Sequence, residues 1–377
     1  MADLRQKSLR VHTLVRVDNL PIGNDQDEIR AFMVVRDEML RLPSTLDHYR
    51  KIGVARFFVT DNGSTDGTKE FLLDQKDCHI FVTSDSYSEA GYGLRWQNAL
   101  LNEYGMNHWC LAVDADEWFI YPGYERIPLA NLTEYLDRSG AQGMFSFLLD
   151  MYGPGSTADA IATPHASLLD ACGYFDSEYE WQRRPRIPAI EPPRFPEYNV
   201  FGGPRLRFLF PNFKNYHYLI RALWRTLDFL PLPLPAPLKT PPTLPKIPLV
   251  HWRPGTRYEH PHATTPIKLS EVTGVLLHFK FLEDFYTRVS TELNRKEHRA
   301  HGIWASELER YLAKLQKNPT LSFHYAGSVA YESSEQLVRL GLLREDHDWK
   351  QIRETAASDS RARRGEGLAP LRGFAEP

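Results

Sequence analysis

Asp114 and Asp116, one residue apart, are the side chains in this sequence best placed to bind a metal ion. They follow the apolar residues 109–113, which predict a buried strand that reaches the surface at the acidic pair. Alternate residues of an extended chain point the same way, so the two carboxylates can converge on one hard cation. Solvated acidic turns have a similar composition, but the position at a strand end favours the metal site.

Strands and helices alternate in the first third of the chain. Short apolar runs predict strands at residues 29–35, 54–60, 79–83 and 109–113. Apolar residues at helical spacing predict helices between them, at residues 39–51, 69–75 and 93–104. Alternation of this kind, with short links, is typical of an α/β fold built on a parallel sheet.

Polar residues follow each predicted strand. The four clusters are Arg36-Asp37-Glu38, Asp61-Asn62-Gly63, Ser84-Asp85 and Asp114-Ala115-Asp116. In a parallel α/β sheet, ligands bind beyond the carboxyl ends of the strands. Because all four clusters belong to that edge, we expect a cleft there.

The alternation of predicted strands and helices becomes irregular after about residue 150. Residues 143–150 predict one more strand, and residues 283–316 a long helical stretch. Eight prolines in residues 231–248 argue against a helix or a central strand, so we expect a loop within one domain, with an interdomain linker as the alternative. Residues 356–377 are charged and poor in apolar side chains, which predicts a disordered tail.

Composition limits the classes of partner. A net charge of −3 gives no general attraction for nucleic acid or an anionic membrane. Three widely spaced cysteines argue against a zinc ribbon or a disulfide framework and fit a reducing cytoplasm. The sequence shows neither a signal peptide nor an apolar run of about 18 residues, so we expect a cytoplasmic protein, peripheral at most at the inner face of the membrane.

Together these motifs resemble the GT-A-type glycosyltransferases, specifically the family 2-like group. The resemblance rests on Val35-Arg36-Asp37-Glu38, on Asp61-Asn62-Gly63-Ser64-Thr65-Asp66-Gly67-Thr68 and on Asp114-Ala115-Asp116-Glu117, in this order and spacing. It covers residues 30–155 well and residues 200–290 less closely. Asp37 stands where the family's first motif has Asn before Glu.

The resemblance implies a nucleotide-diphospho-sugar transferase fold, with a mostly parallel central sheet and helices on both faces. The nucleotide-sugar half would span residues 29–155 and the acceptor half residues 156–290. Residues 1–28 would form an N-terminal extension and residues 291–350 a C-terminal helical region. The implied activity is transfer of a sugar from a nucleotide-diphosphate sugar, expected to be a UDP-sugar, to an acceptor hydroxyl with inversion.

The resemblance also implies a role for each carboxylate. Asp116 would bind Mn²⁺ or Mg²⁺ directly, and Asp114 the ribose or the metal through water. Asp61 would bind the nucleoside base, supported by Asp85, and Glu38 would lie in the same nucleotide-sugar site. The alternative for Asp61 is a turn held by bonds from its side chain to the backbone.

Basic residues late in the chain are candidates for the diphosphate. His278 lies in an apolar, strand-like stretch and is either a core histidine or, as in many GT-A enzymes, a third metal ligand. Lys280 lies on the same side of that stretch and can hold phosphate, as can Lys246 and Arg205. His262 is a further candidate for phosphate, and for Lys246, Arg205 and His262 the alternative is an ordinary surface position.

An inverting transfer needs a base near the acceptor oxygen. We predict Asp176, whose aromatic neighbours can raise its pKa, with Glu178, Glu180 and Asp150 as competitors. The surrounding aromatic residues are either a subsite for a saccharide or glycolipid acceptor or part of the core. Residues 219–238 are a candidate for membrane contact, and polysaccharide biosynthesis is the expected setting.

Two other functions use similar residues. A nucleotidyltransferase would need a glycine-rich loop after the first strand, and residues 34–43 contain no glycine. A non-catalytic nucleotide- or sugar-binding protein on a GT-A scaffold has no need of the intact Asp114-Ala115-Asp116. The sequence therefore favours the transferase.

Overall fold

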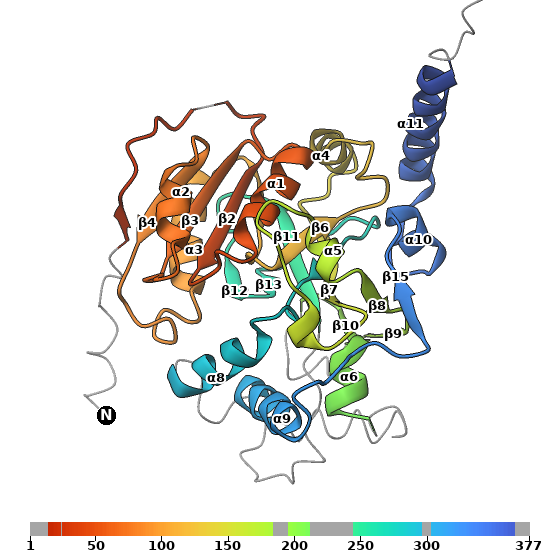
Figure 1. Ribbon diagram of the computed structural model, residues 1–377. Helices are drawn as coiled ribbons and strands as arrows, with labels where there is room; N and C mark the ends of the chain where they lie inside the picture. The colour runs from red at the N-terminus through yellow and green to blue at the C-terminus, as the bar shows by residue number, and fades with distance from the viewer. Residues whose placement is uncertain (1–13, 24, 184–194, 212–243, 296–302, 366–377) are drawn as a thin grey trace, which may run out of the picture.

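A mixed β-sheet organises the molecule (Figure 1). The computed structural model describes residues 14–23, 25–183, 195–211, 244–295 and 303–365. Along its main path the strand order is β1-β4-β3-β2-β5-β11-β7-β14-β6. Six of these strands, β4, β3, β2, β5, β7 and β14, run in one direction, and β1, β11 and β6 run against them. The expected α/β class is confirmed.

The N-terminal half forms as the hydrophobic pattern predicts. Its parallel strands are β2 (Arg30–Val35), β3 (Arg56–Asp61), β4 (Cys78–Val82) and β5 (Trp109–Ala112). They are connected through the helices α1 (Leu42–Ile52), α2 (Thr68–Leu73) and α3 (Leu94–Tyr104). Alternate β2 residues point to opposite faces, so Ala31 and Met33 join the core with α1 while Phe32 joins the core with α3. Helices therefore cover both faces of this half.

A proline-containing strand lies inside the sheet. β11 (Pro245–His251) runs between β5 and β7 (Gly143–Tyr152) and is antiparallel to both. The expectation that the prolines of residues 231–248 exclude a central strand is wrong for residues 245–248. Pro245 is the first residue of β11, and Pro248 lies where the pairing with β7 shifts register, so neither interrupts a regular ladder. Residues 231–243 lie outside the described residues.

A short strand, β6, follows the acidic pair and is antiparallel to its neighbour β14. β6 (Glu117–Ile120) pairs with β14 (Val275–His278), which runs parallel to β7. Residues 113–116 therefore form the loop between β5 and β6, and the end of β14 lies beside this loop. Pairing with β6 places His278 opposite Glu117, although the two are far apart in sequence.

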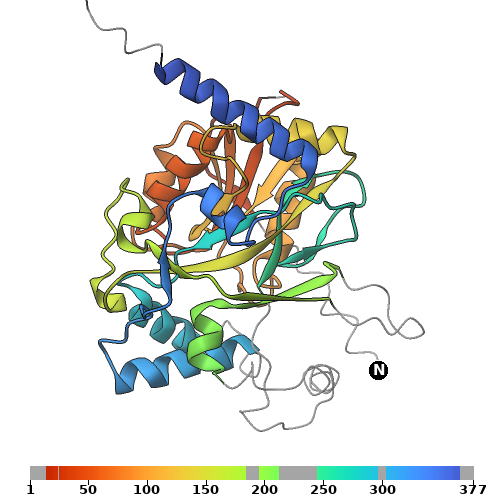
Figure 2. The same ribbon diagram turned by 90° about the vertical axis from the view of Figure 1, so that its right-hand side faces the viewer.

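Smaller elements complete the fold. Strands outside the central part are β1 (Val15–Arg16), β8 (Tyr174–Asp176), β9 (Tyr179–Arg183), β10 (Tyr198–Gly202), β12 (Tyr258–His260), β13 (Ala263–Thr264) and β15 (Ser328–Ala330). The remaining helices are α4 (Leu129–Arg138), η1 (Thr157–Asp159), α5 (Leu168–Ala171), α6 (Gly203–Leu209), α8 (Phe285–Arg295), α9 (Ile303–Lys317), α10 (Ser334–Arg339) and α11 (His347–Gly365). Figure 2 shows α6, α8 and α9 grouped at one end of the sheet.

Two helical assignments differ from the sequence prediction. The stretch 283–316 is two helices, α8 and α9, and residues 296–302 between them lie outside the described residues. Residues 356–365, assigned to a disordered tail, form the last part of α11. Arginine, glutamate and alanine are good helix formers, so the charged composition that predicted disorder also suits an exposed helix. In the described part of the chain, no helix is long and apolar enough to cross a membrane.

Candidate nucleotide-sugar site

A cavity of about 260 Å³ lies at the carboxyl ends of β2, β5 and β14. Its lining includes Glu38 and Asn62 from the N-terminal half, and Asp114 and Asp116 from the loop after β5. His278, the last residue of β14, completes this group. The structure thus brings residues from three of the four predicted polar clusters to one cavity, which we call the strand-end pocket.

The two aspartates have different surroundings. The side chain of Asp116 is 12% exposed and its Oδ2 lies 3.5 Å from His278 Nε2. The side chain of Asp114 is 56% exposed and accepts a hydrogen bond of 2.9 Å from Lys246 Nζ. Burial alone would raise the pKa of Asp116, but the nearby cations, above all His278, outweigh burial and hold it well below its usual range.

His278 lies between two carboxylates. Its Nδ1 is 2.6 Å from Asp150 Oδ1, and its Nε2 faces Asp116. Burial opposes the charged imidazolium, but Asp116 and Asp150 together raise the pKa of His278 to about 8. A histidine that donates Nδ1–H to a carboxylate and directs Nε2 outward has the orientation of a metal ligand.

Arg205 binds Asp150, the carboxylate that contacts His278. Its guanidinium donates two hydrogen bonds of 2.8 Å to Asp150, and both side chains are buried. It does not line the strand-end pocket. The charge of Arg205 is paired with Asp150 within the protein, and its binding of phosphate stays a prediction.

Lys246 also has acidic partners within the protein. Its Nζ donates to Asp114 Oδ2 at 2.9 Å and to Glu117 Oε2 at 2.6 Å. Burial lowers its pKa, but the two carboxylates more than compensate and raise it. Glu117 also accepts a hydrogen bond from the Asp114 backbone N–H. The predicted phosphate ligand Lys246 thus holds the acidic loop in place.

Other cations do line the pocket. Lys280 does so while its Nζ donates to Glu307 at 3.1 Å. Arg288 of α8 lines it too and binds Glu38 through two hydrogen bonds of 2.9 Å. Arg36 also lines it and donates to the Asn62 carbonyl at 3.0 Å. Arg288 was not predicted from the sequence, because its partner Glu38 lies 250 residues earlier in the chain.

The loop after β3 presents a buried, incompletely bonded carboxylate. Asp61 Oδ1 accepts backbone N–H groups from Gly63 and Ser64, as the turn alternative requires. Within the described residues, Asp61 Oδ2 is buried without a hydrogen-bond partner. Asn62 Nδ2 donates to the carbonyl of Asp85, so Asp85 contributes here through its backbone. A buried carboxylate oxygen without a donor is costly, and a ligand N–H would satisfy it.

The donor set fits a cation shared with a phosphate. Among the described residues, no three His, Cys, Asp or Glu side chains form a group that could hold a metal. Asp116 and His278 offer two donors 3.5 Å apart, while Asp114 is held by Lys246. Mg²⁺ is commonly bound by one or two carboxylates together with substrate phosphates and water. Two protein donors therefore suit a metal that arrives with a diphosphate.

The predicted base lies elsewhere. Asp176, on β8, does not line the strand-end pocket, and Arg207 binds its carboxylate through two hydrogen bonds of 3.0 Å. Its competitors do not line that pocket either: Glu178 borders a second cavity, Glu180 accepts from Gln182, and Asp150 binds Arg205. In the described part of the chain, the pocket's carboxylates besides the acidic pair are Glu38 and Glu292.

No family model and no curated protein matches this chain. Among solved structures, it is similar to the crystal structure of S. aureus TarS 1-349, with 16% sequence identity and a TM-score of 0.25. The match covers 33% of this chain and 35% of that one, so the chain spans about a third of the matched structure. A likeness of this extent supports no conclusion about fold or function, and the functional argument rests on the geometry.

Proposed function

We propose that this protein is a metal-dependent glycosyltransferase that moves a sugar from a nucleotide-diphosphate sugar, UDP-linked, to an acceptor hydroxyl. The observation that carries the proposal is the pair formed by Asp116 and His278, 3.5 Å apart in the strand-end pocket, with Asp150 orienting the imidazole. This arrangement lies where α/β sheets bind nucleotides. The intact donor pair favours a transferase over a non-catalytic binding protein.

Different residues of the site would bind the metal, the phosphates, the base and the ribose of the donor. Asp116 and His278 would hold Mn²⁺ or Mg²⁺, which supplies charge neutralisation for the leaving diphosphate. Lys280, Arg288 and Arg36 line the same cavity and would pair with phosphate oxygens. Asp61 does not itself line the cavity but precedes Asn62, which does, and its unsatisfied Oδ2 would accept an N–H of the base. The more exposed Asp114 would bind the ribose hydroxyls.

For the acceptor, an inverting transfer needs a carboxylate that lines the pocket. Glu38 and Glu292 both line it, and Asp176 does not. Glu38 belongs to the loop after β2 and binds Arg288, which we assign to the diphosphate. We therefore propose Glu292, one helical turn beyond Arg288 on α8, as the base. The acceptor is a saccharide or glycolipid, and residues 219–238, the candidate membrane contact, lie outside the described residues.

Hydrolysis of nucleotide sugars tests the proposal without knowledge of the acceptor. A panel of UDP- and other nucleotide-linked hexoses is incubated with the full chain, with Mn²⁺ or with EDTA, and nucleotide release is measured. We expect release from at least one donor with Mn²⁺ and a loss of at least about 100-fold in Asp116→Ala, because metal charge stabilisation amounts to several kcal/mol.

Glu134→Ala serves as the matched control, since it removes an exposed carboxylate from α4, outside the pocket. This control should keep full activity. Metal-independent release, or full activity in Asp116→Ala, would overturn the proposal.

A further inference from the structure

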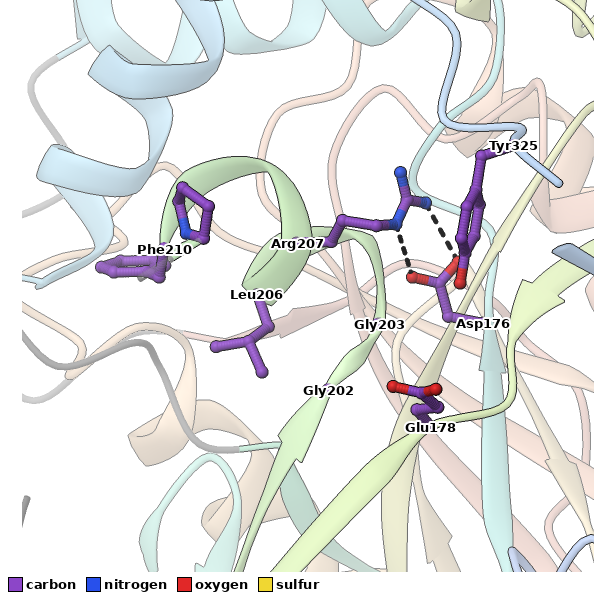
Figure 3. Close-up of a pocket in the computed structure, with 9 residues that line it drawn as sticks. Asp176, Glu178, Gly202, Gly203, Leu206, Arg207, Phe210 and Tyr325 are labelled. Carbon is purple, nitrogen blue, oxygen red and sulfur yellow. Dashed lines mark hydrogen bonds and ion pairs between the residues drawn. The ribbon is translucent and has the colours of Figure 1, made fainter. Parts of the chain in front are cut away.

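A second cavity, of about 190 Å³, lies beside β8 and α6 (Figure 3). Its lining includes Asp176 from β8, Leu206 and Arg207 from α6, and Tyr325 from the segment before β15. Figure 3 shows the Tyr325 ring alongside the Arg207 guanidinium and the Asp176 carboxylate. A cavity needs only ~10–15 Å³ to hold one water molecule, so this cavity is large enough for a small ligand.

An aromatic ring forms part of this cavity. Tyr325 is 37% exposed, and the Arg207 guanidinium carbon lies 4.0 Å from its ring centroid. Arg207 is itself fixed by Asp176 and by the carbonyl of Phe323, to which it donates at 2.7 Å. The ring therefore rests against a rigid support. An aromatic ring has a negative face, which attracts the slightly positive C–H groups of a sugar.

Rigid acceptors for hydroxyl groups lie beside the ring. The Asp176 carboxylate accepts from Tyr152 Oη and twice from Arg207, so its oxygens are fixed before a ligand binds. An ionised carboxylate has about four lone-pair sites, and these three bonds leave one for a ligand hydroxyl. Glu178 borders the same cavity.

The charge of the lining restricts the ligand class. Among the described lining residues, Arg207 is the one cation, and it is paired with Asp176, while Glu178 adds a second carboxylate. This arrangement of charges disfavours phosphate and other anions. An apolar ligand is also disfavoured, because it would cover carboxylate oxygens without bonding to them. A neutral ring with hydroxyl groups and an apolar face suits both parts of the lining.

Side chains that support the two cavities come from the same strand, β7. Asp150 and Tyr152 are two residues apart on β7; Asp150 holds His278 of the strand-end pocket, and Tyr152 donates to Asp176 of the second cavity. Alternate residues of a strand lie on the same side, roughly 7 Å apart. Arg205 and Arg207, also two residues apart, bind Asp150 and Asp176 respectively. The second cavity is therefore anchored to the same strand and helix as the strand-end pocket.

We propose that the second cavity binds a neutral pyranose unit of the acceptor, stacked on Tyr325 and hydrogen-bonded to Asp176. This inference rests on the proposed glycosyl transfer and adds the class of acceptor to it. An acceptor of more than one sugar unit would present its terminal hydroxyl at the strand-end pocket and keep an inner ring on Tyr325.

Saturation-transfer difference NMR on the full chain tests this assignment. The probes are the methyl glycosides of glucose, galactose, mannose and N-acetylglucosamine, with methyl phosphate and choline as charged comparisons. We expect transfer to the ring C–H groups of at least one glycoside. In Tyr325→Ala its Kd should rise about 10-fold or more, equivalent to about 1.4 kcal/mol, whereas Tyr325→Phe should keep the wild-type Kd because the ring remains.

Tyr325 is exposed, so both variants should fold, and their thermal melting is compared with the wild type. The assignment is overturned if no glycoside binds, if binding is unchanged in Tyr325→Ala, or if only choline or methyl phosphate binds. Calorimetry of UDP with Mn²⁺ on the same proteins separates the two proposals. Absence of UDP binding in the wild type would contradict the transferase itself, whereas intact UDP binding without a glycoside signal would contradict only the assignment of this cavity.

Discussion

At the residue scale, the environment of each ionisable side chain determines whether it can meet a ligand. Asp116 and His278 face each other at 3.5 Å inside a cavity. Arg205 and Lys246 are equally charged, yet each is buried against carboxylates of the protein. Removing one partner of such a buried pair leaves an uncompensated charge, which costs about 3–5 kcal/mol. We therefore propose that Arg205 and Lys246 hold the site together without contacting the donor.

Residue type and spacing predicted Asp114, Asp116 and His278, which the structure brings to one cavity, but they did not predict which charged side chains pair with each other. Arg205 meets Asp150, 55 residues earlier, and Lys246 meets Asp114, 132 residues earlier. Such partners come together only through the tertiary fold. The sequence also selected Asp176 without indicating that Arg207 would bind it. The local sequence around a cationic residue therefore does not predict which carboxylate it will bind in the folded protein.

Substitution of Asp150 tests the positioning of His278. Asp150→Asn weakens the fixed orientation of the imidazole, so Mn²⁺ affinity in the presence of UDP should fall by about 10–100-fold. Electron paramagnetic resonance of free Mn²⁺ measures this affinity. The double variant Asp150→Asn/Arg205→Met removes the unpaired guanidinium and should show the same loss with better stability. Unchanged Mn²⁺ affinity in both variants would refute the positioning role.

At the element scale, α8 connects the C-terminal part of the chain to the loop after β2. Arg288 binds Glu38, and Asp284, just before the helix, accepts two hydrogen bonds from Arg41 at 2.6 and 2.7 Å. The parallel half was predictable because each strand and helix forms from contiguous apolar patterns. β11 was not, because its prolines fit only where the pairing with β7 is irregular.

Arg288 provides a test of the role of α8. If its guanidinium moves from Glu38 to the diphosphate, Arg288→Gln should weaken UDP binding about 10-fold, a loss of about 1.4 kcal/mol, and leave uridine binding unchanged. Fluorescence titration or calorimetry with both ligands measures the difference. Tyr286→Ala, an exposed position on the same helix, is the matched control and should change neither affinity. Equal losses for UDP and uridine would show that Arg288 does not contact phosphate.

At the scale of the whole molecule, a buried series of charges joins elements from distant parts of the chain. Asp150 of β7 binds Arg205 of α6, whose Nε lies 3.8 Å from Glu307 of α9. Glu307 in turn accepts a hydrogen bond from Lys280, which lines the strand-end pocket. The pocket and the helices at this end of the sheet are therefore coupled through buried ion pairs, and the fold and the site should be lost together.

The stability of the whole fold should depend on pH through His48. It is buried, stacks on Trp118 with ring centroids 4.7 Å apart and pairs with the Phe119 carbonyl. Burial lowers the pKa of His48 to about 4. Because the unfolded chain, with a histidine pKa near ~6.5, binds the extra proton first, His48 contributes stability above that pH and loses it as the pH falls toward 4. The contribution of His48 to the free energy of unfolding should therefore fall by about 3 kcal/mol as the pH is lowered from about 6.5 to about 4.

Urea unfolding at several pH values measures this contribution. The stability difference between wild type and His48→Asn should shrink as the pH falls from about 6.5 to 4. His165→Asn, at an exposed position, should follow the wild type at every pH. A constant difference between wild type and His48→Asn would show that His48 does not titrate with folding.

Calorimetry of UDP binding, with and without Mn²⁺, tests the central claim most directly. The shared-cation site predicts that Mn²⁺ strengthens UDP binding to the wild type at least about 10-fold and that Asp116→Ala removes this gain while thermal melting shows a folded protein. UDP affinity that ignores Mn²⁺ in the wild type, or a metal-dependent gain that survives in Asp116→Ala, would contradict the account.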